Sequence, residues 1–150
     1  MSHAPALIRL SNPLASKLLK LGLPMGPNVL LTVRGRTSGL PRSMPVAIAE
    51  LDGRRWVIGA YGDVQWVRNL RAAGEAQARL HGQAVHFRAH ELSADEALAF
   101  YTESFPRFLA QLPAVGRAFS KVFFGLVGPE FLNDPARAAQ TKPVFELLPG

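Results

Sequence analysis

The chain has 150 residues, 17 basic and 11 acidic side chains, and a formal net charge of +6. This length predicts a single domain, residues 1–150, with a buried core, and a hydrophobic fraction of 48% excludes a disordered chain. The absence of cysteine excludes disulfides, thiol catalysis and the usual zinc knuckles. No stretch resembles a signal peptide or is long enough to span a bilayer, so we expect a cytoplasmic protein.

The positive charge is confined to the first third of the chain. Residues 1–49 contain six basic side chains and no acidic one, whereas residues 50–150 contain eleven of each. An excess concentrated in this way indicates a local anionic partner, which is a phosphorylated ligand, an acidic membrane surface or nucleic acid.

Residues 1–24 are predicted to form a short basic amphipathic helical segment. Asn12-Pro13 is typical of an N-cap followed by proline at the first helical position, and Gly22 is typical of a helix end. Between them three leucines share one face, and two lysines point toward another. One such helix binds anionic lipid only weakly, so we expect no more than peripheral contact with the inner face of a membrane.

Three strands joined by short connections are predicted next, at residues 28–34, 42–51 and 54–60. The first is rich in leucine and β-branched residues, which is typical of a buried strand. Pro45 predicts an edge or a bulge in the second strand. Asp52-Gly53 is a strong signal for a two-residue hairpin that leads into the third.

A helix over residues 64–73 follows, with Asp63 as its N-cap and Gly74 as its end. Two strands of alternating polarity are predicted after it, at residues 76–81 and 84–90. Gly82-Gln83 connects these two strands as a second hairpin.

Ser93 and Glu96 form a capping box that begins a helix ending near Phe105. Pro106 and Pro113 are predicted to break the following chain into helical pieces. The longest of these pieces and the last strand are predicted at residues 114–127 and 143–148. Because tight turns favour antiparallel pairing, the order predicts an α+β fold, a small barrel of about six mostly antiparallel strands with flanking helices.

The connection between the first two strands, residues 33–42 (VRGRTSGLPR), is a candidate anion site. Its glycines permit positive φ, so that backbone N–H groups can turn inward around an anion. Its arginines can fork onto phosphate or carboxylate oxygens, and its hydroxyls add donors. The residues concerned are Gly35, Arg36, Thr37, Ser38, Gly39 and Arg42. On spacing alone, an ordinary charged turn remains an open alternative.

Residues 59–74 (GAYGDVQWVRNLRAAG) form a second candidate. Trp66 and Asn69 are three residues apart and share one side of the predicted helix. The small residues Gly59 and Ala60 would let a planar cofactor approach the backbone closely. Packing of the tryptophan in the core is the alternative.

Two further patterns have simpler interpretations. His86 and His90 show HxxxH spacing, but residues four apart on a strand lie about 13 Å from each other, so we expect solvated histidines and no metal site. Seven of the nine phenylalanines lie between residues 100 and 131. Core packing competes there with a substrate lining, a dimer face or a membrane contact.

The motifs of side-chain catalysis are missing from the sequence. No nucleophile elbow, paired-carboxylate motif or triad candidate is present, and no nucleic-acid-binding motif accompanies the arginines. We therefore expect no nucleic-acid partner. An enzyme without obvious catalytic side chains is often one whose cofactor carries the chemistry.

A family resemblance extends from about Leu18 to the C-terminus and is carried by three segments, LLTVRGRTSGLPRSMPVAI, WVIGAYGDVQWVRNLRAAG and KPVFELLP. They resemble the deazaflavin (F420)-dependent nitroreductase and quinone reductase family of split β-barrel oxidoreductases. The resemblance implies hydride transfer from reduced coenzyme F420 to an apolar acceptor, which is a quinone, a nitroaromatic compound or an enone. Relatives of this fold bind FMN, haem or fatty acids, so an FMN-binding reductase and a non-catalytic lipid carrier remain alternatives. The resemblance leaves open a monomer or a homodimer.

The resemblance also implies the residues of the cofactor site. A loop would hold the phosphate and acidic tail, the next strand would flank the deazaflavin ring, a strand end would lie beside the ring edge, and a helix would close the site. In that order these residues are Arg36, Thr37, Ser38, Gly39 and Arg42; Pro45 and Val46; Gly59, Ala60 and Tyr61; and Trp66 and Asn69. Tyr61 is the candidate catalytic residue, as a proton donor or an orienting hydroxyl. Many members carry a lysine or arginine where this chain has Thr37.

Overall fold

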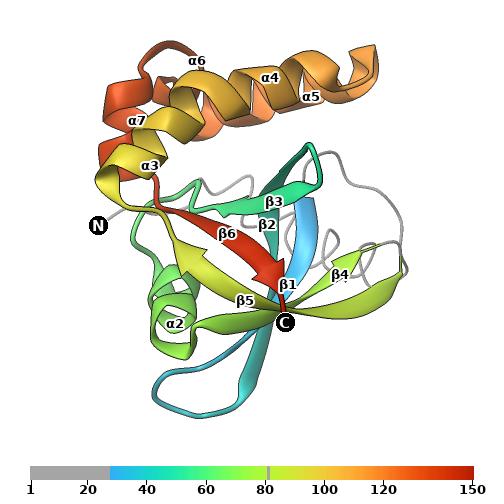
Figure 1. The fold of residues 1–150 in the computed structure, drawn as a ribbon, viewed down its shortest axis with the longest axis vertical. Coiled ribbons are helices and arrows are strands. Elements are labelled where there is room, and N and C mark those ends of the chain that lie inside the picture. The colour runs from blue at the N-terminus through green and yellow to red at the C-terminus, as the bar shows by residue number, and fades with distance from the viewer. Residues whose placement is uncertain (1–27, 81) are drawn as a thin grey trace.

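The computed structural model describes residues 28–80 and 82–150, which form a six-stranded barrel with helices packed against it (Figure 1). The helix predicted within residues 1–24 lies outside the described residues. Among the helices that the structure describes, none is long and apolar enough to cross a membrane.

The barrel consists of β1 (Asn28–Arg34), β2 (Pro41–Leu51), β3 (Arg54–Ile58), β4 (Glu75–Leu80), β5 (Gln83–Glu91) and β6 (Val144–Pro149). Their spatial order is β1-β2-β3-β6-β5-β4, and every neighbouring pair is antiparallel. The barrel closes where residues 30–32 of β1 pair with residues 77–79 of β4. This arrangement confirms the predicted α+β barrel of about six antiparallel strands.

The connections around β2 follow from local chemistry. Asp52 and Gly53 both have positive φ, 52° and 78°, as the predicted two-residue hairpin requires. Pro45 pairs with Leu30 of β1, whereas β3 pairs with β2 only from Ala47 onward. The missing N–H of Pro45 therefore falls where β2 has a partner on one side only, which confirms the predicted edge.

Two predictions between β3 and the following helix are wrong. β3 ends at Ile58, two residues before the predicted end: the N–H of Gly59 still donates to the carbonyl oxygen of Pro143, the next residue in the β3–β6 register, at 2.7 Å, but Pro143 has no N–H to donate in return. Asp63 is not the N-cap of α2 (Gln65–Ala73). Its carboxylate instead accepts hydrogen bonds from two arginine side chains of α2, which compete with the free N–H groups of the helix.

The remaining helices are α3 (Ala94–Ala99), the π-helical turn η1 (Phe100–Ser104), α4 (Phe105–Gln111), α5 (Ala114–Val127), α6 (Glu130–Asn133) and α7 (Pro135–Thr141). Ser93 and Glu96 form the predicted capping box, with reciprocal hydrogen bonds of 3.2 and 2.8 Å. Gly74 ends α2 as predicted, with a φ of 71° and its N–H bonded to the carbonyl oxygen of Leu70.

The predicted helix break at Pro106 is wrong. Helical structure continues from Ala94 to Gln111 through α3, η1 and α4. In η1 the hydrogen bonds shift to the i−5 pattern, and the N–H of Phe105 bonds to the carbonyl oxygen of Phe100. A π turn leaves one carbonyl without its usual donor, so the proline that follows continues the helix without breaking a bond.

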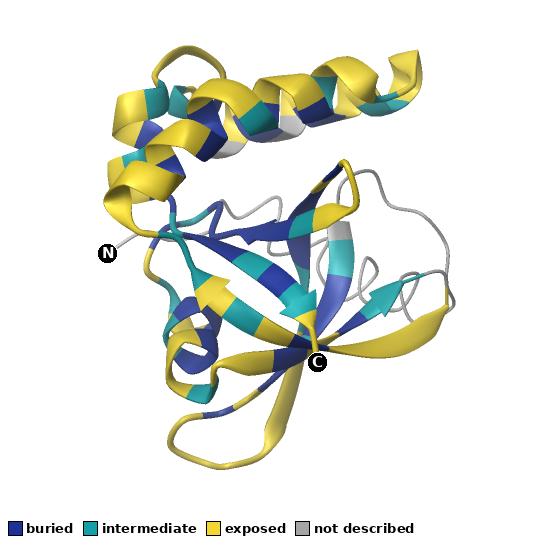
Figure 2. Cartoon of the chain, in the orientation of Figure 1, coloured by how far each residue is buried: buried dark blue, intermediate teal, exposed yellow. Residues whose placement is uncertain are grey.

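Two groups of buried side chains hold these layers together (Figure 2). One fills the barrel and includes the inner face of α2. The other lies between the barrel and the layer formed by α3 to α7, and it is rich in aromatic rings: Trp56, Phe100, Tyr101, Phe105, Phe108, Phe124 and Phe131. Core packing, one of the interpretations of the phenylalanine-rich segment, is therefore confirmed for five of its phenylalanine rings.

Replacing Phe105 by alanine is expected to destabilise the protein by about 3–5 kcal/mol. Phe105 is fully buried, and its ring contacts five other aromatic rings at centroid distances of 5.0 to 6.3 Å. Urea unfolding followed by circular dichroism measures the change. Leu98→Ala, at a side chain that is 42% exposed, is the control and is expected to cost under about 1 kcal/mol. Equal losses in both variants would contradict the aromatic core.

Candidate functional site

The loop between β1 and β2 is closed by its own hydrogen bonds. The N–H of Gly35 donates to the carbonyl oxygen of Leu40 at 2.8 Å, and the N–H of Gly39 donates to that of Gly35 at 2.9 Å. Only Gly39 of the two glycines has positive φ, at 73°. A Cβ at Gly35 would lie 2.7 Å from the hydroxyl oxygen of Ser38, so a larger residue here would require the Ser38 side chain to move. The loop is thus a tight turn with a defined shape.

Arg36 fastens this loop to α2. Its backbone N–H and its Nη1 both donate to Oδ1 of Asn69, at 3.1 and 2.7 Å. Its Nη2 donates to Oε1 of Gln65 at 2.9 Å. Asn69 is 4% exposed, so a nearly buried amide oxygen holds both the backbone and the side chain of Arg36. The two segments that the sequence analysis singled out separately therefore meet at one place.

Gln65 is a site residue that the sequence analysis missed. It lies one turn before Asn69, and residues four apart on a helix share a face. Because an amide side chain at this spacing from Asn69 faces the same partner, the signal was present in the sequence.

The meeting point of the loop and α2 borders a pocket of about 350 Å³. Its lining combines guanidinium, hydroxyl and amide groups from both segments: Gly35, Arg36, Thr37, Ser38, Arg42, Gln65 and Asn69. None of these lining residues is acidic. Both oxygen acceptors that hold Arg36 are neutral amides, so its positive charge is not compensated by them. This donor set suits an anion.

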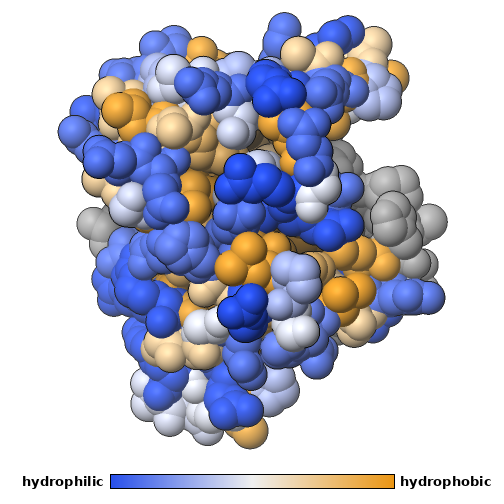
Figure 3. Space-filling view, viewed as in Figure 1, coloured by the Kyte–Doolittle hydropathy of each residue, from blue (hydrophilic) through white to orange (hydrophobic). Residues whose placement is uncertain are grey.

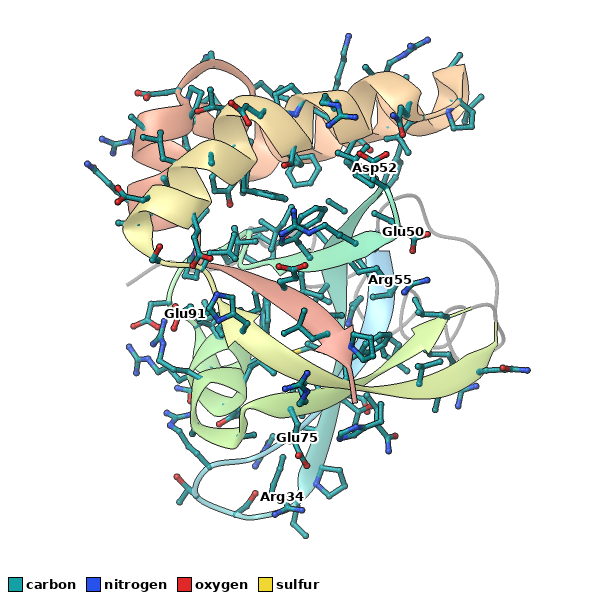
Figure 4. All side chains as sticks on the ribbon, viewed as in Figure 1. Arg34, Glu50, Asp52, Arg55, Glu75 and Glu91 are labelled. Carbon is teal, nitrogen blue, oxygen red and sulfur yellow. The ribbon has the colours of Figure 1, made fainter. Side chains whose placement is uncertain are left out.

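A larger pocket of about 870 Å³ lies against the same loop and extends toward β4 and β5. It is bordered by Arg34, Thr37 and Ser38 on one side and by Glu75 and other residues of the barrel on another. Figure 4 shows Arg34 and Glu75 at this end of the barrel, near the β1–β2 loop. The loop therefore lines two pockets, of which one has no acidic lining residue and the other has the carboxylate of Glu75.

α2 is held in place by packing and by ion pairs. Val67 and Leu70 are fully buried in the barrel core. On the outer side Arg71 donates two hydrogen bonds to the carboxylate of Glu91 on β5, at 2.7 and 2.8 Å, and this contact raises the pKa of Arg71. Because α2 is fixed on both sides, Asn69 is presented to the loop in one position.

The residues expected beside the ring lie outside the lining of these two pockets. Val46 and Trp66 are buried in the barrel core, and the Trp66 ring lies 6.5 Å from that of Phe145. The Trp66 side chain is therefore part of the barrel core. Pro45 is half-buried.

The strand end at residues 59–61 is enclosed by the chain itself. A Cβ at Gly59 would lie 3.1 to 3.2 Å from atoms of Pro143 and Val67, so the space beside this glycine is filled by protein. The carbonyl oxygen of Ala60 accepts a hydrogen bond from Nζ of the buried Lys142 at 3.0 Å. These contacts explain why small residues occupy both positions.

Tyr61 is half-buried, and its hydroxyl is enclosed without a hydrogen-bond partner among the described residues. Burial raises the pKa of Tyr61 from 10.0 to about 12, so the phenol keeps its proton at neutral pH. Tyr101, by contrast, donates its hydroxyl hydrogen to the carbonyl oxygen of Lys142 at 2.9 Å. Within residues 28–80 and 82–150, the Tyr61 hydroxyl is therefore a donor without an acceptor.

His86 and His90 both lie on β5 with side chains that are 47% and 48% exposed. His86 is 3.8 Å from the carboxylate of Glu75, and His90 is 3.1 Å from that of Glu96. Within residues 28–80 and 82–150, no group of three or more histidine, aspartate, glutamate or cysteine side chains could hold a metal ion.

The barrel and its helices define the class of the protein as a split β-barrel. Two solved structures overlap with almost the whole chain. One, from Bacteroides thetaiotaomicron, is provisionally described as a 5-nitroimidazole antibiotic resistance protein; it has a TM-score of 0.53 and 8% identity, and the match covers 98% of this chain and 81% of that one. The other is Atu2129 from Agrobacterium tumefaciens, of unknown function; it has a TM-score of 0.51 and 15% identity, and the match covers 97% of this chain and 55% of that one. At these identities the likeness shows the fold alone. A structure described as an F420-H2 dependent reductase, FDR-A, covers 81% of this chain and 93% of its own at 18% identity and a TM-score of 0.45.

The family follows from the sequence itself. Residues 17–111, well over half of the chain, match the model of the F420H(2)-dependent quinone reductase family. The chain belongs to this family, which confirms the resemblance found in the sequence. The matched residues include the β1–β2 loop and α2, the two parts that meet at the candidate site. No curated protein matches this chain.

Replacing Asn69 by alanine is expected to lower the free energy of unfolding by about 1–3 kcal/mol, because two donors of Arg36 lose their acceptor. Asn69→Asp keeps an acceptor oxygen in the same place and is expected to lose much less. Urea unfolding measures the stability, and hydrogen exchange of the Arg36 amide reports the contact directly. Gln65→Ala, which removes an exposed hydrogen bond, is the control. Slow exchange of the Arg36 amide in Asn69→Ala would contradict the anchoring role.

The two tyrosines are expected to respond in opposite directions to loss of the hydroxyl. Tyr61→Phe removes an unsatisfied buried donor and is expected to keep or raise stability by about 1 kcal/mol. Tyr101→Phe removes a buried hydrogen bond and is expected to lower stability by about 1 kcal/mol. Thermal and urea unfolding of both variants make the comparison. A larger loss in Tyr61→Phe than in Tyr101→Phe would show that the Tyr61 hydroxyl has a partner.

Proposed function

We propose that this chain is an F420H2-dependent oxidoreductase that passes a hydride from reduced deazaflavin to an apolar acceptor such as a quinone, a nitroaromatic compound or an activated enone. Family membership supports the choice of cofactor. The observation that carries the proposal is the contact between Arg36 and Asn69, which joins the β1–β2 loop and α2 at one pocket without acidic residues. A phosphodiester with a glutamyl tail is polyanionic, and this pocket suits such a group.

The anionic end of the cofactor is assigned to Arg36, Thr37, Ser38, Gly39 and Arg42. A guanidinium group has five N–H donors, and only two nitrogens of Arg36 are used by α2, so donors remain for an anion. Arg42 lies close by, with its Nε 3.3 Å from the position of a Cβ at Gly35. Thr37 adds a hydroxyl where many relatives have a cation. The two arginines would therefore carry most of the charge interaction.

The ring end of the cofactor is assigned to Pro45, Val46, Gly59, Ala60, Tyr61 and Trp66. Burial divides this set into two roles. Pro45 and Tyr61 are half-buried and have surface left to touch a ring. Val46, Ala60 and Trp66 are 4 to 8% exposed and would support that surface from behind.

When bound, reduced deazaflavin supplies the hydride. The tasks of the protein are to hold the cofactor, to leave one face open to the acceptor and to exclude water. Tyr61 keeps its proton at neutral pH, since burial raises its pKa further, from 10.0 to about 12, and its enclosed hydroxyl would donate a hydrogen bond or a proton to the acceptor once the side chain turns toward it. A cytoplasmic location and weak lipid contact through residues 1–24 suit a quinone and remain predictions.

Titration with oxidised F420, followed by fluorescence, is expected to show saturable binding, whereas FMN is expected not to bind. The double variant Arg36→Ala/Arg42→Ala is expected to weaken F420 binding by about tenfold or more, because charge-assisted hydrogen bonds are lost. Arg117→Ala is the matched control, since Arg117 lies on α5 and is exposed. Unchanged affinity in the double variant would remove the loop from the cofactor site.

Other results of the same titration lead to different functions. If neither F420 nor FMN binds at about tens of micromolar, the oxidoreductase proposal fails. Binding of FMN alone would indicate a flavin reductase. A lipid that copurifies with the protein, together with no F420 binding, would indicate a carrier.

A further inference from the structure

Lys142 is a buried cation that the proposed chemistry does not use. Within residues 28–80 and 82–150 it is the one charged residue that is buried, at 6% exposed. Figure 3 shows hydrophilic residues over much of the outer surface of the helical layer, where charged side chains ordinarily lie. Lys142 lies instead in the short connection by which α7 of that layer leads into β6 of the barrel (Figure 1). Taking an ammonium group out of water costs free energy, so its position here needs a physical reason.

The ammonium group of Lys142 has partners in both layers. Its Nζ donates a hydrogen bond to the carbonyl oxygen of Ala60 at 3.0 Å and lies 3.6 Å from Oε1 of Glu130 on α6. It also lies 5.6 Å from the centre of the Phe131 ring, within the range of a cation–π contact. An ammonium group has three N–H donors. A carbonyl, a carboxylate and a ring together can take all three, so Lys142 is suited to hold the chain rather than to bind a ligand.

Lys142 and Pro143 hold the chain after β3 at two successive residues. The carbonyl oxygen of Pro143 accepts a hydrogen bond from the N–H of Gly59 at 2.7 Å, and the Lys142 ammonium donates to the next residue, Ala60. The backbone of Lys142 is held in turn, because its carbonyl oxygen accepts the hydroxyl hydrogen of the buried Tyr101 at 2.9 Å. Tyr101 lies in η1. The helical layer therefore fixes the chain that directly follows β3.

The carbonyl oxygen that Lys142 holds belongs to the peptide group that joins Ala60 to Tyr61. A peptide group is planar, so a hydrogen bond to its oxygen also sets the direction of the Tyr61 N–H and the position of the Tyr61 Cα. Within the described residues, the Tyr61 hydroxyl has no hydrogen bond that would fix the far end of the side chain. The position of Tyr61 therefore depends on its packing and on its backbone, and Lys142 holds the backbone.

Stability alone does not account for this buried charge. Replacing a buried ion pair by uncharged residues of similar volume is often neutral or stabilising, because desolvation offsets the attraction between the charges. Methionine is a flexible, unbranched side chain that would fill the space of the lysine stem. What methionine lacks is a donor for the carbonyl oxygen of Ala60. The property of Lys142 that packing cannot replace is therefore its hold on the peptide group between Ala60 and Tyr61.

We propose that Lys142 is a positioning residue that holds the backbone of Tyr61 while its side chain turns toward the acceptor, a role that rests on the proposed function, in which the Tyr61 hydroxyl donates to the acceptor. Lys142 acts through Tyr61 and not by contact with the cofactor. Glu130 keeps the buried ammonium charge paired. Loss of the anchor slows the step in which Tyr61 takes part and leaves the anionic end of the cofactor bound at the β1–β2 loop.

The double variant Lys142→Met/Glu130→Gln removes the anchor without leaving a buried charge unpaired. With F420H2 and duroquinone as substrates, its kcat is expected to fall about tenfold or more. Its Kd for oxidised F420 is expected to change less than about threefold, because Arg36 and Arg42 still hold the anionic end. A loss confined to kcat separates the positioning of Tyr61 from the binding of the cofactor.

Two control variants show which contact matters. Glu130→Gln alone keeps the Lys142 donor and an oxygen beside it, and it is expected to keep kcat within about twofold. Arg107→Met removes another ion pair between the helical layer and the barrel, which Arg107 of α4 forms with Asp52 at 3.1 Å on the surface. This variant is expected to keep both kcat and Kd.

A double-mutant cycle shows whether Lys142 acts through Tyr61. Tyr61→Phe alone is expected to lower kcat about tenfold or more, because the donor to the acceptor is lost. Adding Lys142→Met/Glu130→Gln to Tyr61→Phe is then expected to lower kcat by less than about twofold further, since there is no hydroxyl left to position. A general disturbance of packing would instead multiply the two losses.

NMR of the tyrosine rings gives a measurement that needs no cofactor. The chain has two tyrosines, so the signals missing from Tyr61→Phe are those of Tyr61. In Lys142→Met/Glu130→Gln the Tyr61 signals are expected to shift and to broaden when a soluble paramagnetic probe is added. Those of Tyr101, which donates to the backbone of residue 142 and not to its side chain, are expected to stay as in the natural protein.

Three results would overturn the positioning role of Lys142. The first is a kcat and Tyr61 signals that do not change in Lys142→Met/Glu130→Gln. The second is losses of kcat that multiply in the cycle with Tyr61→Phe. The third is failure of the double variant to fold in urea-unfolding measurements, which would make the ion pair a requirement of the fold.

Failure of the proposed function gives a different result. If the natural protein neither binds F420 nor reduces duroquinone with F420H2, the oxidoreductase proposal fails. The Tyr61 signals of Lys142→Met/Glu130→Gln still decide, without any cofactor, whether Lys142 positions Tyr61.

Discussion

The candidate site depends on one nearly buried oxygen atom, Oδ1 of Asn69, which accepts hydrogen bonds from both the backbone and the side chain of Arg36. The β1–β2 loop projects from the barrel, and this contact fastens it to α2. Neutral amides hold the guanidinium, so its position is fixed while its charge stays available. A carboxylate in the same place would have fixed the side chain and cancelled the charge together.

The position of Asn69 in turn depends on the barrel core. Val67 and Leu70 bury the inner face of α2, and the ion pair between Arg71 and Glu91 holds its outer side against β5. The position of Asn69 at the anion pocket therefore follows from the apolar packing of its neighbours on the same helix. The chain that follows β3 is fixed by the helical layer, because Nζ of Lys142, directly after α7, donates a hydrogen bond to the carbonyl oxygen of Ala60. Lys142 also lies 3.6 Å from Glu130 of α6, so its charge is paired.

The sequence predicted those features whose cause lies within a few residues. The hairpin at Asp52-Gly53, the capping box at Ser93 and the end of α2 at Gly74 are confirmed, because each is decided by local φ and a local hydrogen bond. The predictions at Asp63 and Pro106 are wrong because hydrogen bonds other than the expected ones form at both places. Arginines of α2 occupy the Asp63 carboxylate, and a π turn accommodates the proline.

By itself the sequence determined the antiparallel barrel, the family and the loop with its arginines, because periodicity, turn residues and motif spacing are local properties of the chain. Tertiary structure decided which of the candidate residues meet. It placed Asn69 and Gln65 on Arg36, buried Trp66 in the core, and filled the space beside Gly59 with Pro143 and Val67. Contacts between separate segments of the chain depend on how the strands and helices pack together, and no local pattern encodes that packing.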